Sequence, residues 1–116
     1  MIKRNKDLRI VDNEAMRGGP GVVTFEHFVD QPEEMCDKGT VFAKVTLKPG
    51  CGIGYHVHET NTELMYILSG EADYDNNGTL EKVYGGDVTI CPPGEGHSIT
   101  NNTNDIVEFI ALILNK

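Results

Sequence analysis

Turn-forming residues recur along the whole chain and divide it into short apolar segments. The 116 residues include 13 glycines and 5 prolines. Between these turn signals lie segments rich in β-branched, aromatic and aliphatic side chains, which we expect to be strands at residues 22–29, 42–47, 63–68, 71–74, 80–84, 87–91 and 106–114. Short strands separated at regular intervals by such residues are typical of an all-β barrel or sandwich. We therefore expect an all-β fold, with one helical turn at 31–35 that has Pro32 at its first position.

The chain has the length and composition of one globular domain. Hydrophobic residues make up 39% of it, which is enough to form a core. Residues 1–21 are polar and end in Gly18-Gly19-Pro20-Gly21, so we expect an N-terminal lead-in segment followed by a single domain at 22–116. No apolar run approaches the roughly 20 residues of a membrane span. The basic N-terminus is not followed by an apolar stretch, so no secretory signal is expected.

Charge and cysteine content exclude several classes of partner. The formal net charge of −8 disfavours binding to nucleic acid, since an acidic surface repels phosphate. The one basic cluster, Lys3 to Arg9, is interpreted as a solvated face. Cys36, Cys51 and Cys91 form an odd and widely spaced set, which is typical of reduced thiols and predicts a cytoplasmic location.

Two of the expected strands are apolar on both faces. In 106–114 only Glu108 interrupts the apolar residues, and 63–68 has Leu64, Tyr66 and Leu68 on one face with Met65 and Ile67 on the other. A half-exposed strand would alternate apolar with polar residues. Both faces therefore need cover, and in a chain with little helix a second subunit would supply it. We expect a homodimer formed through packed sheets.

Three of the four histidines fall into one pattern with a glutamate. His56 and His58 are two residues apart, so on a strand both side chains point to the same face. Glu63 opens the next strand after a polar linker. His97 follows the turn 92–96 and can return on a neighbouring strand. The remaining histidine, His27, is interpreted as a structural residue.

Three imidazoles and one carboxylate form a ligand set that suits a divalent transition metal. Mn²⁺, Fe²⁺, Co²⁺, Ni²⁺, Zn²⁺ and Cu²⁺ all accept such ligands, so the identity of the metal stays open. Four protein ligands would complete a tetrahedral zinc site. A six-coordinate ion would keep two positions for water, substrate or dioxygen. We predict a metal site formed by His56, His58, Glu63 and His97.

Two longer motifs surround these residues. The first reads Gly50-x5-His56-x-His58-x4-Glu63-x6-Gly70, and the second reads Gly86-x5-Pro92-x-Gly94-x2-His97-x3-Asn101. The pair resembles the two motifs of the cupin superfamily, with every defining position filled. The resemblance implies a compact single-domain cupin: a double-stranded β-helix, or jelly-roll barrel, that holds one metal on the four predicted ligands.

Membership in this superfamily does not determine a reaction, because the same fold serves many functions. One hypothesis is a metal-dependent enzyme, an oxidoreductase of the dioxygenase type acting on a small oxygen-rich substrate, with a cupin isomerase or decarboxylase as close variants. The alternative is a non-catalytic protein that binds or senses a metal or a small molecule. The sequence identifies no general acid or base. Tyr55, Tyr66 and Cys51 are candidates by proximity alone, and Tyr66 is expected in the core.

Overall fold

The computed structural model describes all 116 residues and is almost entirely β-structure. Three short 3₁₀ turns, η1 (Asn5–Asp7), η2 (Met16–Gly18) and η3 (Pro32–Met35), accompany the strands. The strands are β1 (Arg9–Glu14), β2 (Val22–His27), β3 (Gly39–Leu47), β4 (Gly52–Val57), β5 (Asn61–Ser69), β6 (Glu71–Asn76), β7 (Thr79–Tyr84), β8 (Val88–Cys91), β9 (Gly96–Thr100) and β10 (Val107–Asn115). The expected all-β fold is confirmed.

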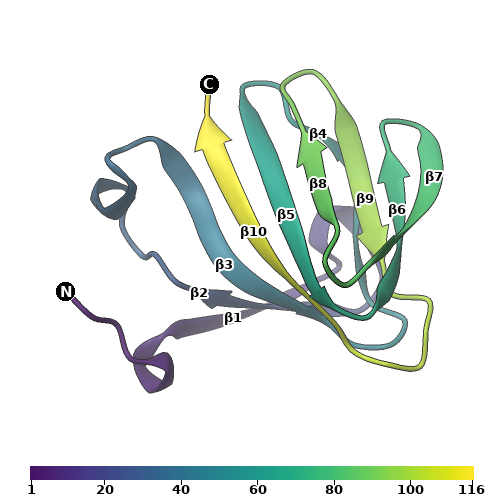
Figure 1. Cartoon of the computed structure of the whole chain (residues 1–116), viewed down its shortest axis with the longest axis horizontal. Coiled ribbons are helices and arrows are strands. Elements are labelled where there is room, and N and C mark those ends of the chain that lie inside the picture. Colours follow the sequence, from purple (N-terminus) through teal and green to yellow (C-terminus); the bar gives the residue numbers. More distant parts are fainter.

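Two antiparallel sheets form a jelly roll. The larger sheet has the order β1-β2-β3-β10-β5-β8, and the smaller has β4-β9-β6-β7. Figure 1 shows the sheets facing each other in the half of the molecule that contains β4 to β9, whereas β1, β2 and the start of β3 extend beyond the smaller sheet. Strands distant in sequence therefore become neighbours, as β10 does when it pairs with both β3 and β5.

The core lies between the two sheets and follows the two-residue period of the strands. Ala43, Val45 and Leu47 of β3 are fully buried, and Phe109 and Ala111 of β10 lie beside them. Ile99 of β9 enters the same cluster from the smaller sheet. The inner faces of β4, β5 and β9 continue this apolar layer into a polar region, which contains the predicted metal ligands.

One strand was not expected. β1 lies within the polar lead-in segment and pairs with β2 from Arg9–His27 to Glu14–Val22. Its sequence carries little strand signal because β1 is the edge of the larger sheet and most of its side chains are exposed. The division between lead-in and domain at residue 21 stays a prediction. The predicted turn at 31–35 is confirmed as η3, with Gln31 as its N-cap.

The outer face of the larger sheet carries an unusually continuous apolar surface. Across four strands Phe42 lies beside Leu112, Leu112 beside Leu64, and Leu64 beside Ile90; the next row runs from Ile110 through Tyr66 to Val88. No other part of the chain covers this surface, and Val88 and Ile90 are 60% and 59% exposed. The seven residues, called the outer apolar face below, are Phe42, Leu64, Tyr66, Val88, Ile90, Ile110 and Leu112. Tyr66 was expected in the core; this prediction is wrong, because its position in β5 faces outward.

No helix of the structure is both long enough and apolar enough to span a membrane.

Candidate metal centre

Two strands of the smaller sheet and one of the larger sheet bring the four predicted ligands together. His56 of β4 lies directly opposite His97 of β9 in the strand register. His58 follows the end of β4, where its backbone N–H donates to the Glu95 carbonyl and its own carbonyl accepts from the Gly94 N–H. Glu63, near the start of β5, faces the histidines from the larger sheet. The turn that contains Gly94 thus positions His58 as well as leading into β9.

The ligand atoms converge on one point. Glu63 Oε1 lies 2.9 Å from His97 Nε2, 3.0 Å from His58 Nε2 and 3.9 Å from His56 Nε2. The Nε2 atoms of His58 and His97 are 3.1 Å apart. One ligand atom from each of the four residues lies within 4.8 Å of every other. The structure therefore brings together the whole set that the sequence spacing predicts.

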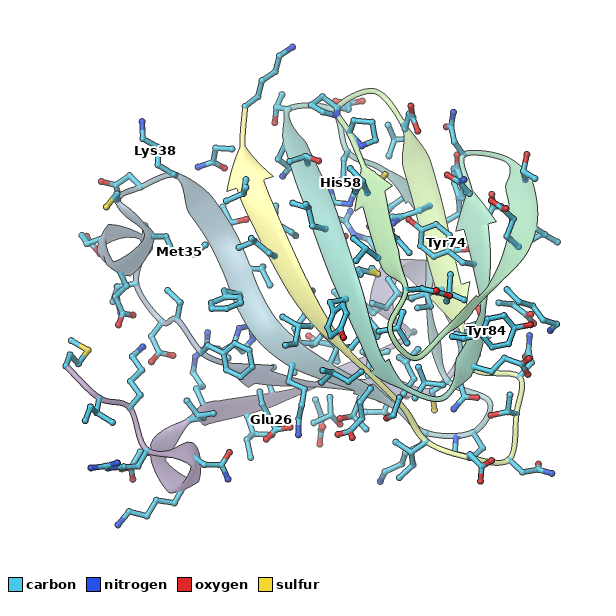
Figure 2. All side chains as sticks on the ribbon, viewed as in Figure 1. Glu26, Met35, Lys38, His58, Tyr74 and Tyr84 are labelled. Carbon is cyan, nitrogen blue, oxygen red and sulfur yellow. The ribbon has the colours of Figure 1, made fainter.

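The cluster is buried where the two sheets face each other. His97 is 1% exposed and Glu63 and His58 are each 6% exposed, while His56 is partly buried. Figure 2 shows the His58 side chain in the half of the molecule between the sheets. Burial of a carboxylate and three imidazoles is costly unless they are paired or coordinate an ion. His56 forms the more accessible side of the cluster.

The far nitrogen of each imidazole is held by an oxygen atom. His56 Nδ1 lies 2.8 Å from the Gly54 carbonyl oxygen, and His58 Nδ1 lies 2.7 Å from Asn61 Oδ1. His97 Nδ1 lies 2.7 Å from the Tyr74 hydroxyl. When Nδ1 donates its proton to such an oxygen, the lone pair is left on Nε2, which is the arrangement of metal-binding histidines. All three Nε2 atoms point toward Glu63, so the donor set fits a cation placed among them.

Electrostatics within the cluster favour the charged forms of His58 and Glu63. The hydrogen bond to Glu63 is the main cause that raises the pKa of His58, against the opposing effect of burial. Burial raises the pKa of Glu63, but the hydrogen bonds from His56, His58 and His97 outweigh it and hold that pKa well below its ordinary value. Glu63 is therefore an anion at neutral pH, and a cation or a protonated imidazole beside it balances its charge.

The sequence analysis did not identify two polar residues that contact the predicted ligands. Asn61, which contacts His58, belongs to the polar stretch just before Glu63, and this proximity was its only indication. Tyr74, which contacts His97, lies on β6, and no sequence motif marks it. The proposed acid–base candidates lie elsewhere: Tyr55 and Tyr66 are 48% and 47% exposed, on the outer faces of their sheets. Cys51 is partly buried and contacts the Pro49 carbonyl oxygen at 3.9 Å.

A second cysteine lies closer to the ligands. Cys91 is directly opposite Glu63 in the register of β5 and β8, and it is buried. Burial raises the pKa of its thiol to about 11, with smaller contributions from Glu63 and Glu95. The thiol is therefore neutral at physiological pH and is a poor nucleophile. None of the three cysteines is joined in a disulfide.

Comparison with protein families now adds to this geometry. The family model "Cupin domain" matches residues 43–113, a segment that contains every predicted ligand and most of both sheets. The chain belongs to the cupin family. The resemblance stated from the two sequence motifs is thereby confirmed.

Two of the proteins similar to this cupin have names that refer to oxalate. It is 38% identical to the oxalate-binding protein of Thermotoga maritima over 114 residues, which cover 98% of this chain and 93% of that protein. It superposes with a TM-score of 0.93 on the crystal structure of a predicted oxalate decarboxylase from Thermotoga maritima, at 37% identity and full coverage of both chains. The polyketide cyclase RemF of Streptomyces resistomycificus shares only the fold, with 21% identity, a TM-score of 0.75 and coverage of 99% and 85% of the two chains.

Proposed function

We propose that this cupin binds one divalent transition metal through His56, His58, Glu63 and His97, and that the metal-loaded protein binds oxalate or a similarly small dicarboxylate. The observation that carries the proposal is the convergence of the four ligand atoms, three of them imidazole nitrogens whose far nitrogens lie against oxygen atoms. The name of the oxalate-binding relative supports the choice of ligand.

Three imidazoles and one carboxylate suit Mn²⁺, Fe²⁺, Co²⁺, Ni²⁺, Zn²⁺ or Cu²⁺. A six-coordinate ion held by the four protein ligands would keep two positions open.

Two open positions match the two oxygen atoms of a chelating dicarboxylate. When bound, the metal supplies the positive charge that holds and polarises these oxygens. A divalent cation, the Glu63 carboxylate and an oxalate dianion would together carry one excess negative charge. Arg17 of η2 lies at the edge of β4, and its positive charge acts on His58. It is placed to compensate for that excess.

Binding is favoured over catalysis by the groups around the cluster. Burial is the main cause that raises the pKa of Tyr74, to about 12, and the neutral Cys91 thiol is similarly resistant to ionisation. Neither group readily transfers a proton near pH 7. Decarboxylation is the second candidate, because one similar structure is that of a predicted oxalate decarboxylase. The dioxygenase-type reaction expected from the sequence stays a prediction.

Calorimetry with the purified protein tests the proposal. Metal-free protein is loaded in turn with Mn²⁺, Co²⁺ and Zn²⁺ and titrated with oxalate, with acetate as the matched monocarboxylate. We expect oxalate to bind only the metal-loaded forms and at least tenfold more tightly than acetate. Equal affinity for the two anions, or oxalate binding without metal, would contradict the proposal. Carbon dioxide release, measured under air and under nitrogen, then distinguishes a binder from a decarboxylase or a dioxygenase.

We also propose that the outer apolar face forms the interface of a homodimer. Its seven residues form one row across four strands and a second row across three. Lys44 continues the second row on β3 and is ion-paired with Glu26 and Glu108. Exposed apolar surfaces of this continuity mark interaction sites. A second copy of the same face is apolar at the matching positions, which supports a symmetric contact.

A further inference from the structure

Glu63 lies in a row of residues that crosses the larger sheet on its inner face. Ile113 of β10 is directly opposite Glu63, and Val41 of β3 is directly opposite Ile113. Directly opposite residues of antiparallel strands share one face of the sheet. Glu63 points toward the imidazoles of the cluster, so Ile113 and Val41 point to the same side, from strands that lie next to each other in Figure 1. Ile113 is therefore the direct neighbour of a proposed metal ligand.

Burial decreases along this row. On the β8 side of Glu63 the row ends in Cys91, which is 2% exposed, and Glu63 itself is 6% exposed. On the other side, Ile113 and Val41 are only partly buried. Val41 packs against the buried core without being enclosed by it. The row thus runs from a closed interior at β8 toward solvent at β3.

The cluster is closed on the side of the core. The next inner residue of β5 is Met65, which is 2% exposed, and the next inner residue of β9 is Ile99, which is fully buried. A ligand of the proposed metal cannot approach through these side chains. The open side lies where His56 and Ile113 are only partly buried, one on each sheet.

The two walls of this open side differ in chemistry. On the larger sheet, Ile113 and Val41 offer only methyl and methylene groups. On the smaller sheet, η2 packs on β4, and the positive charge of Arg17 acts on His58. Carboxylate oxygens that face the apolar wall would lose hydration without gaining a hydrogen bond. The open side therefore suits a ligand whose charged groups lie close to the cluster and toward η2.

We propose that Ile113 and Val41 form an apolar wall that limits the ligand to the two carbons of oxalate. The wall leaves no polar partner for a carboxylate that extends further from the cluster. One added methylene changes binding to a shaped site by about tenfold to two-hundredfold. The inference rests on the proposed function and makes Ile113 and Val41 specificity-determining residues, which are not metal ligands.

The test compares oxalate with malonate, which is longer by one methylene. Both are titrated by calorimetry into the same Co²⁺-saturated protein, so their Kd ratio is independent of metal loading. We expect the wild type to prefer oxalate by about tenfold or more. Part of this preference comes from the smaller chelate ring of oxalate, so the change between variants is decisive. Ile113→Ala should reduce the preference about fivefold or more, and Val41→Ala should reduce it by a smaller factor.

A matched control lies next to Ile113 on the same strand. Leu114 points to the opposite face of β10 by the period of the strand and is outside the outer apolar face. Leu114→Ala should keep the ratio of the wild type. Methyl NMR of the Zn²⁺-loaded protein is a second measurement: oxalate should shift the Ile113 methyl signals, whereas those of Ile90 on the outer face should stay in place.

The outcomes separate this inference from the proposed function. If the metal-loaded wild type does not bind oxalate, the proposed function fails, and the wall fails with it. If oxalate binds but Ile113→Ala and Val41→Ala both keep the ratio within twofold of the wild type, only the wall is wrong. An equal change in Leu114→Ala would also contradict it, because the effect would then be a general loosening of β10. Should Ile113→Ala not fold, Ile113→Val, which removes one methyl group, and Val41→Ala decide.

Discussion

The backbone of Arg17 lies against the Cα of Gly54, where a Cβ atom would overlap the Arg17 carbonyl oxygen. The Gly54 carbonyl in turn accepts the hydrogen bond from His56 Nδ1. Arg17 itself has φ 52° and ψ 31°, a left-handed conformation that is uncommon for a residue other than glycine. The close contact of η2 with β4 therefore constrains the Gly54 carbonyl, which holds the imidazole of His56, one of the proposed metal ligands.

Substitution of Gly54 by alanine is expected to displace η2 and disturb His56 together. The added Cβ meets backbone and not a flexible side chain, so we expect a loss of about 1–3 kcal/mol in the free energy of unfolding. Metal affinity should fall as well. Urea unfolding and chelator competition measure the two effects. Gly85→Ala is the control, because its nearest neighbour would lie at 3.3 Å and it is remote from the ligands.

Loss of the Glu63 charge is expected to weaken metal binding without leaving a cavity in the protein interior. Glu63→Gln keeps the shape and a carbonyl oxygen but removes the only anionic ligand of the cluster. We expect at least a tenfold loss in Co²⁺ affinity and a smaller rise in melting temperature on addition of metal, since that rise depends on the ratio of metal concentration to Kd. Differential scanning fluorimetry measures it. His27→Gln, outside the cluster, should respond to metal like the wild type; an unchanged response of Glu63→Gln would contradict the ligand assignment.

Arg17 is expected to contribute to the affinity for a dicarboxylate and not to the affinity for the metal. Arg17→Gln should weaken oxalate binding to the metal-loaded protein about fivefold to tenfold, and this difference should shrink as salt is added, because Arg17 is exposed. Calorimetry at two ionic strengths is the measurement. Arg4→Gln removes an equal charge in the N-terminal segment and should bind oxalate like the wild type. If both variants weaken oxalate binding equally, net charge and not position is responsible.

The outer apolar face is expected to hold two copies of the chain together. Tyr66→Glu places a charge in the middle of its second row, where burial in an interface would leave that charge unpaired. Light scattering at micromolar concentration should give twice the 12.8 kDa chain mass for the wild type and the single mass for this variant. Leu80→Glu changes an apolar residue that is 76% exposed on β7 and should stay dimeric. A monomeric wild type at these concentrations would exclude the proposed dimer.

The N-terminal segment is expected to detach in acid. Hydrogen bonds from Lys3 and then from the backbone N–H groups of Asp30 and Gln31 lower the pKa of Glu34 to about 2. The ordinary value is 4.5, so the folded state binds this proton less readily than the unfolded state. The stabilisation is therefore fully present above about pH 4.5 and lost as pH falls toward 2. NMR signals of residues 1–8 should sharpen over that range. In Glu34→Gln the change should be smaller, and the part that remains should come from Asp30, which also pairs with Lys3 and Arg9 and has a lowered pKa.

Local sequence was sufficient for most of the strands and for the pairing of His56 with His58, but not for β1. Turn residues mark the ends of most strands, because glycine, proline and asparagine interrupt pairing wherever they occur. His56 and His58 share a face through the two-residue period of a strand, which needs no knowledge of the fold. Their union with Glu63 and His97 could be predicted only through the spacing of the two cupin motifs.

Tertiary structure alone decided which residues support those ligands. Tyr74 meets His97 because β6 pairs with β9, a register that places Asn76 opposite His97 and that no local pattern encodes. The outward direction of Tyr66 likewise depends on how β5 is placed between β10 and β8 in the larger sheet. Residue type and spacing thus determined a cupin with a candidate metal site. Hydrogen-bond partners and exposed faces followed from strand pairing, because these contacts join residues that are far apart in the chain.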